Sequence, residues 1–82
     1  MRVRLLLFAA LRDIAGAPEI VLDLANGTRV IDVWNELRAR HAALAAYVTP
    51  PLSAINEDYA DPASELHDGD ELAFVPPVSG GH

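Results

Sequence analysis

One segment with helical periodicity, residues 30–45, lies between segments in which apolar and polar residues alternate. Its apolar residues recur at the spacing of a single helix face, at Val30, Val33, Leu37 and Leu44. The alternating segments are typical of strands, and we predict strands at residues 2–9, 19–24, 52–56 and 71–75. The order strand, strand, helix, strand, strand predicts an α+β domain in which one main helix packs across one face of a sheet.

The chain has 82 residues, which fits one domain. We expect residues 1–76 to form this domain and residues 77–82 to form an extended, flexible tail. A chain of this size buries roughly 60–65% of the surface that its unfolded form exposes. That core leaves no room for a deep catalytic pocket, so we expect a partner protein to supply most of any catalytic site.

The charged residues exclude several kinds of partner. The net charge is −6, and the six cationic residues are all Arg, so phosphate backbones repel the surface and nucleic acid is not an expected partner. Without Lys, the chain cannot accept an isopeptide bond on a lysine side chain and can only be its donor. The apolar run at residues 5–10 is too short to span a bilayer, so we expect a cytoplasmic protein without a membrane partner.

The residues that bind metals in other proteins form no convincing site. There is no Cys, which excludes disulfides and thiolate ligands, and any sulfur that the protein carries cannot sit on a side-chain thiol. His41 and His67 lie in different predicted elements. Asp68-Gly69-Asp70 is typical of a turn rather than of a cation site. We therefore predict no metal site.

The last predicted strand runs directly into Pro76-Pro77-Val78-Ser79-Gly80-Gly81. The two prolines fix φ and offer no N–H, so they end strand pairing and favour an extended exit. The two glycines lack Cβ and can enter a channel too narrow for other residues. From Pro77 to Gly81 the reach is at most about 17 Å. On these residues alone, insertion into a partner's active site and an ordinary frayed terminus both stay open.

Three segments together carry a family pattern. Residues 66–81 contain Asp-Gly-Asp-Glu, a strand and Pro-Pro-Val-Ser-Gly-Gly in one run. Residues 7–13 followed by Gly16, and Ile55-Asn56-Glu57, complete the pattern. Over nearly the whole chain, these segments resemble the small, sulfur-carrier subunit of molybdopterin synthase.

The resemblance implies a ubiquitin-like β-grasp fold with one main helix on a mixed sheet of four to five strands. It also implies that an adenylating, E1-like activating enzyme uses ATP to activate the carboxylate of Gly81, and that sulfur then replaces AMP to give a thiocarboxylate. The tail enters the large synthase subunit, with Gly80 in its narrow part, and sulfur passes to a cyclic pyranopterin to form molybdopterin. The chain would bind no cofactor and would not be catalytic by itself.

The resemblance further implies that an apolar face of the sheet docks the partners. Alternation places Phe8 and Val75 away from the helix, with Tyr59 joining them and Arg12 at the edge. Ordinary packing is the alternative for each of these side chains. The tail residues Pro76, Pro77, Val78 and Ser79 would complete the binding surface.

One residue departs from the family pattern, because His82 follows Gly81. The carboxylate of Gly81 is then held in an amide and cannot be adenylated. We expect His82 to be the remnant of an expression tag, and proteolytic removal is the alternative.

Two other functions stay open. A related carrier for the thiazole of thiamine or for a sulfur amino acid would share the fold and the Gly-Gly end, and would be distinguished by the large partner that it binds. A non-catalytic β-grasp binding module would keep its function after deletion of Gly80 and Gly81.

Overall fold

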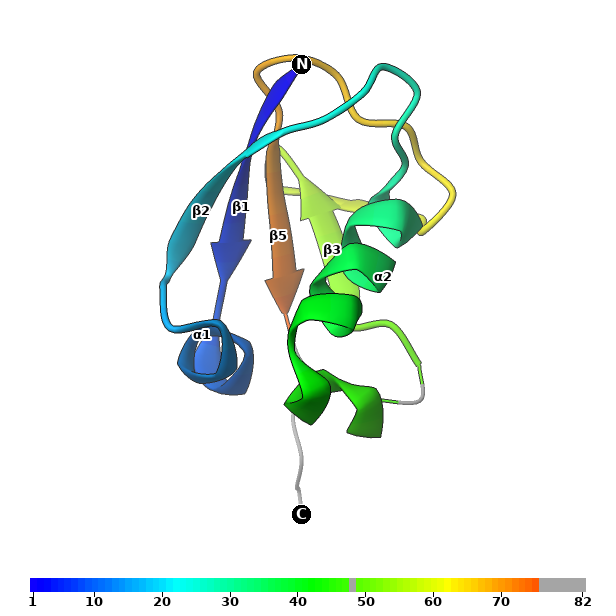
Figure 1. The fold of residues 1–82 in the computed structure, drawn as a ribbon. Helices are drawn as coiled ribbons and strands as arrows, with labels where there is room; N and C mark the ends of the chain where they lie inside the picture. The colour runs from blue at the N-terminus through cyan, green and yellow to red at the C-terminus, as the bar shows by residue number, and fades with distance from the viewer. Residues whose placement is uncertain (48, 76–82) are drawn as a thin grey trace.

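The computed structural model describes residues 1–47 and 49–75. Figure 1 shows one sheet with α2 lying across it, and β1 and β5 running side by side away from the N-terminus. Along these residues the elements are β1 (Arg2–Leu7), α1 (Ala9–Ala15), β2 (Glu19–Asp23), α2 (Val30–Arg40), the 3-10 helix η1 (Ala42–Ala46), β3 (Leu52–Ile55), β4 (Asp58–Ala60) and β5 (Glu71–Val75).

The five strands form one mixed sheet in the order β2-β1-β5-β3-β4. The two central strands, β1 and β5, are parallel, and the other neighbouring pairs are antiparallel. A parallel central pair requires a crossover, and α2 provides it on one face of the sheet. The predicted α+β class and the β-grasp arrangement are confirmed.

The core lies between α2 and the face of the sheet that it covers, which we call the inner face. Phe74 of β5 is fully buried, and its ring meets Trp34 of α2 edge to face with centroids 5.4 Å apart. The apolar stripe predicted from the helical spacing is buried as expected. The core side chains are Val3, Leu5, Leu7, Leu11, Val30, Val33, Trp34, Leu37, Leu44, Leu66, Leu72 and Phe74.

The predicted helix at residues 30–45 is wrong over its last five residues. The α-helix ends at Arg40, and His41 takes an extended conformation with φ −129° and ψ 103°. The chain then forms η1, which buries Leu44 and brings Tyr47 within 6.0 Å of the Trp34 ring. Because the α-helix ends at Arg40, residues 42–47 cover the end of the core. The local helical spacing does not signal this additional burial.

The predicted first strand at residues 2–9 extends too far, because α1 starts at Ala9. Phe8 is the N-cap of α1, and Gly16 closes the helix with φ 81° while donating its N–H to the carbonyl of Arg12 at 2.9 Å. Leu11 packs into the core at 1% exposure and holds the helix in place. The apolar run at residues 5–10 is therefore divided between a strand and a helix.

Strand β4 was also missed in the sequence. Asn56 and Glu57 both have positive φ, 50° and 74°, and connect β3 to β4 as a two-residue hairpin of type I′. The predicted turn at residues 56–58 is thus correct in place, but the chain pairs with β3 immediately after it. Among the described residues, no helix is long and apolar enough to cross a membrane.

Candidate partner-docking site

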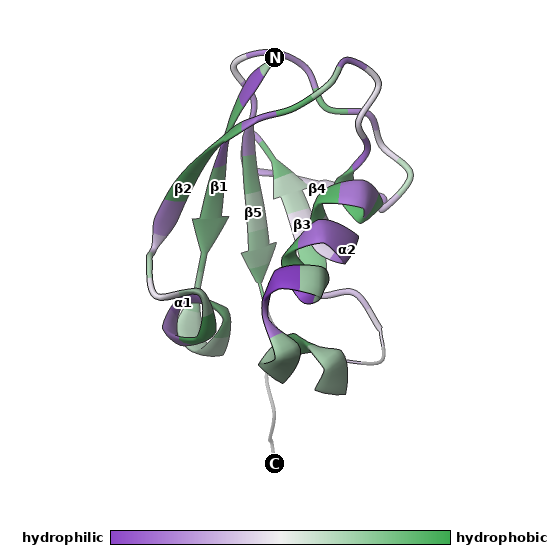
Figure 2. Cartoon of the chain, in the orientation of Figure 1, coloured by the Kyte–Doolittle hydropathy of each residue, from purple (hydrophilic) through white to green (hydrophobic). Residues whose placement is uncertain are grey.

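The side of the sheet turned away from α2, its outer face, is divided into a charged end and an apolar end. Figure 2 shows β1 polar where it begins and apolar toward its end. At the charged end Arg4 of β1 forms ion pairs with Glu71 of β5 and, at 3.7 Å, with Glu19 of β2. Arg2 and Asp23 form another ion pair at 3.5 Å. These exposed pairs contribute little to stability but keep this end of the face hydrated.

The apolar end of the outer face exposes large side chains. Phe8 is 46% exposed, Leu52 is 58% exposed and Tyr59 is 81% exposed. Strand register brings them together, because Leu52 lies opposite Val75 and Tyr59 lies opposite Ala54, which in turn faces Ala73. We call this surface the outer apolar patch, and its residues are Leu6, Phe8, Leu52, Ala54, Tyr59, Ala73 and Val75.

Phe8 reaches the patch from the junction of β1 and α1. It keeps an extended backbone, with φ −123° and ψ 153°, so it continues the alternation of β1 and points away from the core. Ala9 follows with φ 51°, in the left-handed region, and the chain reverses there into α1. Phe8 is 46% exposed, which agrees with its predicted orientation away from α2, although it is a helix cap rather than a strand residue. Its part in partner binding stays a prediction.

Arg12 lies on α1, which contacts β5. Its guanidinium is exposed and sits 3.9 Å from the carboxylate of Asp13. Figure 1 shows α1 beside the point where β5 ends. Arg12 therefore belongs to the helix beside the end of β5, and its place at the border of the outer apolar patch stays a prediction.

The end of β5 is the point from which the chain continues. Val75 is its last residue, half-buried between the ends of β1 and β3. The remaining predicted site residues, Pro76, Pro77, Val78, Ser79, Gly80 and Gly81, lie outside the described residues, as does His82. The exit of the chain thus lies in the middle of the sheet and directly at the outer apolar patch.

The start of β5 is held by the Asp-Gly-Asp turn. Asp70 accepts hydrogen bonds from the N–H of His67 at 2.7 Å and from the side-chain amide of Asn56 at 2.9 Å. Asn56 also accepts the N–H of Glu71 at 3.0 Å and donates its own N–H to the Glu71 carbonyl at 2.8 Å. These bonds fix the register of β5 and therefore the position at which the chain leaves this strand. The acids of this turn have a structural role, as the sequence indicated.

Leu6, Leu52, Ala54 and Ala73 are patch residues that the sequence analysis did not name, and Leu52 is the large exposed one among them. Its neighbour Ser53 is the polar residue that turns inward, at 4% exposure, so the usual rule that apolar residues face the core fails in this strand. The signal that finds Leu52 is its position opposite Val75, which only strand pairing reveals. Among the described residues, no group of three or more His, Cys, Asp or Glu is placed to hold a metal ion.

The chain is similar in sequence and in fold to known proteins. Residues 5–81 match the model of the ThiS family. A molybdopterin synthase sulfur carrier subunit from Chlamydomonas reinhardtii is 36% identical over 83 residues, covering 99% of this chain and all of the relative. One from Mycobacterium tuberculosis is 32% identical over 82 residues, covering 99% of both chains. The crystal structure of SAMP1 from Haloferax volcanii superposes with a TM-score of 0.81 at 30% identity, over 99% of this chain.

Proposed function

The chain belongs to the ThiS family, and from this we propose that it is the sulfur-carrier subunit of a molybdopterin synthase. The observation that carries the proposal is that sulfur carrier subunits of this enzyme align with the chain from end to end. The family match continues through Gly81, the residue that would carry the sulfur. The chain acts as a carrier, and its activating and acceptor sites lie on other proteins.

Gly81 carries the reactive group in this proposal. In a chain that ends at Gly81, its free carboxylate attacks the α-phosphate of ATP on an adenylating enzyme, which releases pyrophosphate and leaves an acyl adenylate. A sulfur nucleophile then displaces AMP, and the C–O bond to phosphate is replaced by a C–S bond. The resulting thiocarboxylate is a nucleophile at neutral pH. Its sulfur attacks a carbon of a cyclic pyranopterin held by the large subunit and forms a thioester. Water then cleaves the C–S bond to Gly81, which leaves the sulfur on the pterin and regenerates the carboxylate.

The large subunit would bind the outer apolar patch. A cluster of exposed aromatic and aliphatic side chains beside the exit of β5 suits a docking surface, because aromatic anchors contribute most of the binding energy at such interfaces. From Val75, the six residues to Gly81 span at most about 20 Å when extended. Docking at the patch would therefore place Gly81 at an acceptor site within that reach, with Pro76 and Pro77 limiting the conformations to be fixed on binding.

Several residues have defined roles in this proposal. Gly80 would pass the narrow part of the acceptor channel, while Val78 and Ser79 would line its entrance. Arg12 at the patch border would meet an acidic group of the partner. The chain itself binds no cofactor, and ATP is used by the activating enzyme. The proposal places this chemistry in the cytoplasm, where ATP is available.

The proposal is tested by the intact mass of two chains that differ by one residue. One chain ends at Gly81 and the other keeps His82. Each is incubated with ATP, an adenylating enzyme of a ThiS-family pathway and a sulfur source. We expect the chain ending at Gly81 to gain the mass difference between oxygen and sulfur. The chain that keeps His82 should not change, because its Gly81 carboxylate is in an amide.

Sulfur transfer is then measured by adding the large synthase subunit and cyclic pyranopterin. Formation of molybdopterin with loss of the added mass supports the assignment. A thiocarboxylate that forms but transfers sulfur only to a thiazole or amino-acid pathway would assign the chain to a related carrier. A chain ending at Gly81 that never gains sulfur would overturn the carrier function altogether.

A further inference from the structure

The free edge of β2 leaves backbone hydrogen-bonding groups without partners. Met1 and Leu24 exchange two hydrogen bonds of 2.8 Å, and Leu7 donates to Pro18 at 2.9 Å. Because bonded pairs alternate along an antiparallel ladder, the bonded residues of β2 are the even-numbered ones. The N–H and C=O groups of Glu19, Val21 and Asp23 therefore point away from β1. Within residues 1–47 and 49–75, these groups form no hydrogen bond.

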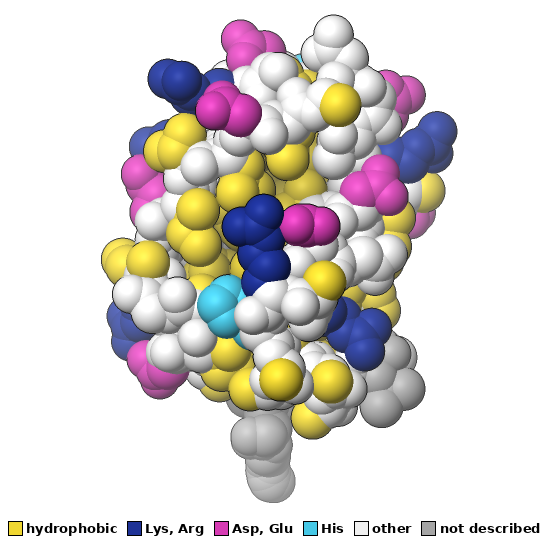
Figure 3. Space-filling view, in the orientation of Figure 1, with side chains coloured by type: hydrophobic (Ala, Val, Ile, Leu, Met, Phe, Trp, Pro, Cys, Tyr) yellow, Lys and Arg dark blue, Asp and Glu magenta, His cyan; other side chains and the backbone are white. Residues whose placement is uncertain are grey.

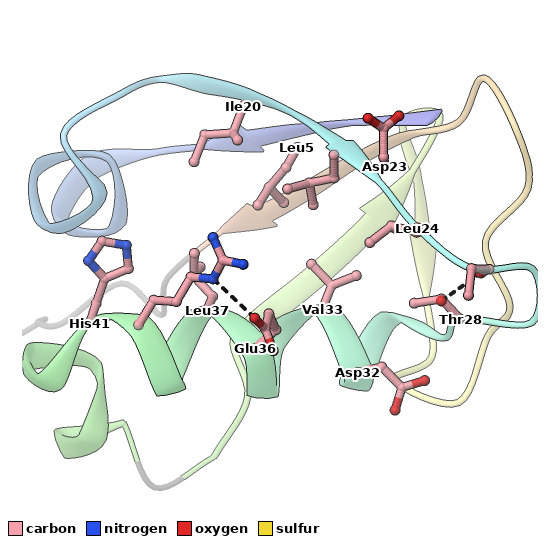
Figure 4. A pocket seen from close by; sticks show the side chains of 13 residues that line it. Leu5, Ile20, Asp23, Leu24, Thr28, Asp32, Val33, Glu36, Leu37 and His41 are labelled. Atoms are coloured by element: carbon pink, nitrogen blue, oxygen red, sulfur yellow. Dashed lines mark hydrogen bonds and ion pairs between the residues drawn. The ribbon is translucent and has the colours of Figure 1, made fainter. Parts of the chain in front are cut away.

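An apolar groove runs beside this edge, between β2 and α2. Figure 4 shows Ile20 and Leu5 from the sheet facing Val33 and Leu37 of α2 across it, and its volume is about 400 Å³. Ile20 and Leu22 stay half-buried, whereas Val3 and Leu5 on the neighbouring strand are fully buried. In Figure 3 apolar side chains form the floor of this hollow, and charged side chains and a His lie over part of it. The groove is lined in part by Glu36 and Arg40, which form an ion pair at 3.0 Å, and by His41. The inward side chains of an added strand would find apolar contacts there.

The outward side chains of β2 determine which charges on an added strand are favourable. Glu19, Val21 and Asp23 point to the outer face, and Val21 is 54% exposed. Antiparallel pairing of two copies centred on Val21 would set Glu19 of one copy against Asp23 of the other, and facing like charges are destabilising. A second copy of this chain is therefore disfavoured. Glu19 and Asp23 each form an ion pair with an arginine of β1, but their side chains stay 45% and 83% exposed. A segment with a cation at each of these two positions is therefore complementary to the edge, because it meets the exposed side of each carboxylate.

From these observations we propose that the edge of β2 binds an extended segment of a partner protein as an added antiparallel strand. The segment has the pattern basic, apolar, apolar, apolar, basic. Its basic residues lie opposite Glu19 and Asp23, and its central residue lies opposite Val21. The two apolar residues between them enter the groove beside Ile20 and Leu22. Recognition by main-chain bonds with alternating side-chain pockets is a recurring mode of peptide binding.

This interaction surface is separate from the one proposed for sulfur transfer. The outer apolar patch extends from the end of β1 across β5 and β3 to β4, whereas the proposed added strand pairs with the free edge of β2. The two surfaces adjoin where Leu6 lies opposite Glu19, but they share no residue. A partner strand bound along the edge of β2 therefore leaves Leu52, Tyr59 and the end of β5 uncovered. The inference does not depend on the chain being a sulfur carrier, and it applies equally to a β-grasp binding module.

The test is a titration of the folded protein with the peptide acetyl-Gly-Arg-Ile-Val-Ile-Arg-Gly-amide, followed by amide NMR. We expect saturable shifts at Glu19, Val21 and Asp23 and slower hydrogen exchange at the N–H of Val21. A peptide with Glu in place of both Arg residues should bind at least about tenfold more weakly, because two attractive pairs become repulsive.

Two variants probe the edge itself. Val21→Pro removes an outward N–H that β1 does not use, which an edge strand tolerates, and should weaken peptide binding about tenfold. Glu19→Gln with Asp23→Asn should weaken it by a similar factor. The matched control is Glu57→Gln with Asp58→Asn, which removes the same charge from the far edge of the sheet and should change affinity less than about twofold.

The proposal is overturned if the peptide shifts residues of the outer apolar patch instead of β2. It is also overturned if the Glu peptide binds as tightly as the Arg peptide. If Val21→Pro does not fold, the two double variants still test the proposal. Equal losses of peptide affinity in Glu19→Gln with Asp23→Asn and in Glu57→Gln with Asp58→Asn would show that the peptide responds only to the net charge of the protein, and would overturn the proposal.

Discussion

The two faces of the sheet are built from the same strands but differ in how deeply their side chains are buried. On the inner face, Leu72 and Phe74 of β5 are completely buried. On the outer face, Val75 of the same strand joins Leu52 and Tyr59, which are 58% and 81% exposed. Successive residues of one strand thus belong either to the core or to a surface that a partner can cover.

This difference separates folding energy from binding energy. Substitutions on the inner face remove contacts that stabilise the folded chain, whereas exposed side chains outside such contacts change stability by less than about 0.5 kcal/mol. An outer-face substitution should therefore alter partner binding with little change in folding. The following variants are designed to break or sharpen this separation, beginning with the largest expected effect.

Phe74→Ala tests the inner face. The ring is fully buried against Trp34, so its removal leaves a cavity and should lower the free energy of unfolding by about 3–5 kcal/mol. Urea denaturation followed by circular dichroism measures this loss. Phe74→Leu is the control and should lose much less, because it keeps most of the apolar volume. A loss below about 1 kcal/mol for Phe74→Ala would mean that β5 is not the centre of the core.

Phe8→Ser tests the outer face. Phe8 makes no side-chain capping bond as the N-cap of α1, and Ser is a preferred N-cap residue, so stability should fall by no more than about 0.5 kcal/mol. Affinity for the large synthase subunit should fall at least about tenfold, because an aromatic anchor is lost. Calorimetric titration measures the affinity, and Phe8→Leu should recover part of it. Unchanged affinity would remove Phe8 from the docking surface.

Glu57→Gly tests the hairpin that links β3 and β4 at one edge of the sheet. Glu57 has φ 74°, and a left-handed conformation costs a residue with Cβ about 1 kcal/mol. Because Gly has no Cβ, this variant should raise the free energy of unfolding by up to about 1 kcal/mol, measured by urea denaturation. Glu57→Ala is the control, since it removes the same carboxylate but keeps the strain. Equal stability of the Gly and Ala variants would contradict the assigned turn.

The sequence predicted the elements whose periodicity matches their burial. Strand β5 is found at the predicted residues, and the apolar stripe on α2 is buried as its spacing required. Prediction failed where burial and pattern disagree. Ser53 turns inward beside an exposed Leu52, and the apolar run at residues 5–10 divides between β1 and α1 because Ala9 takes a positive φ. Neither feature has a local signal.

The sequence by itself determined the α+β class, the order of the main elements and the Gly-Gly end, because periodicity and the chemistry of Pro and Gly are local properties. The tertiary structure decided which side chains stand together. Strand register alone sets Val75 opposite Leu52 and links Tyr59 through Ala54 to Ala73. The groove beside Ile20 exists only because β2 and α2 stand on either side of it. Surfaces built from segments far apart in the chain depend on pairing and packing, which no single segment specifies.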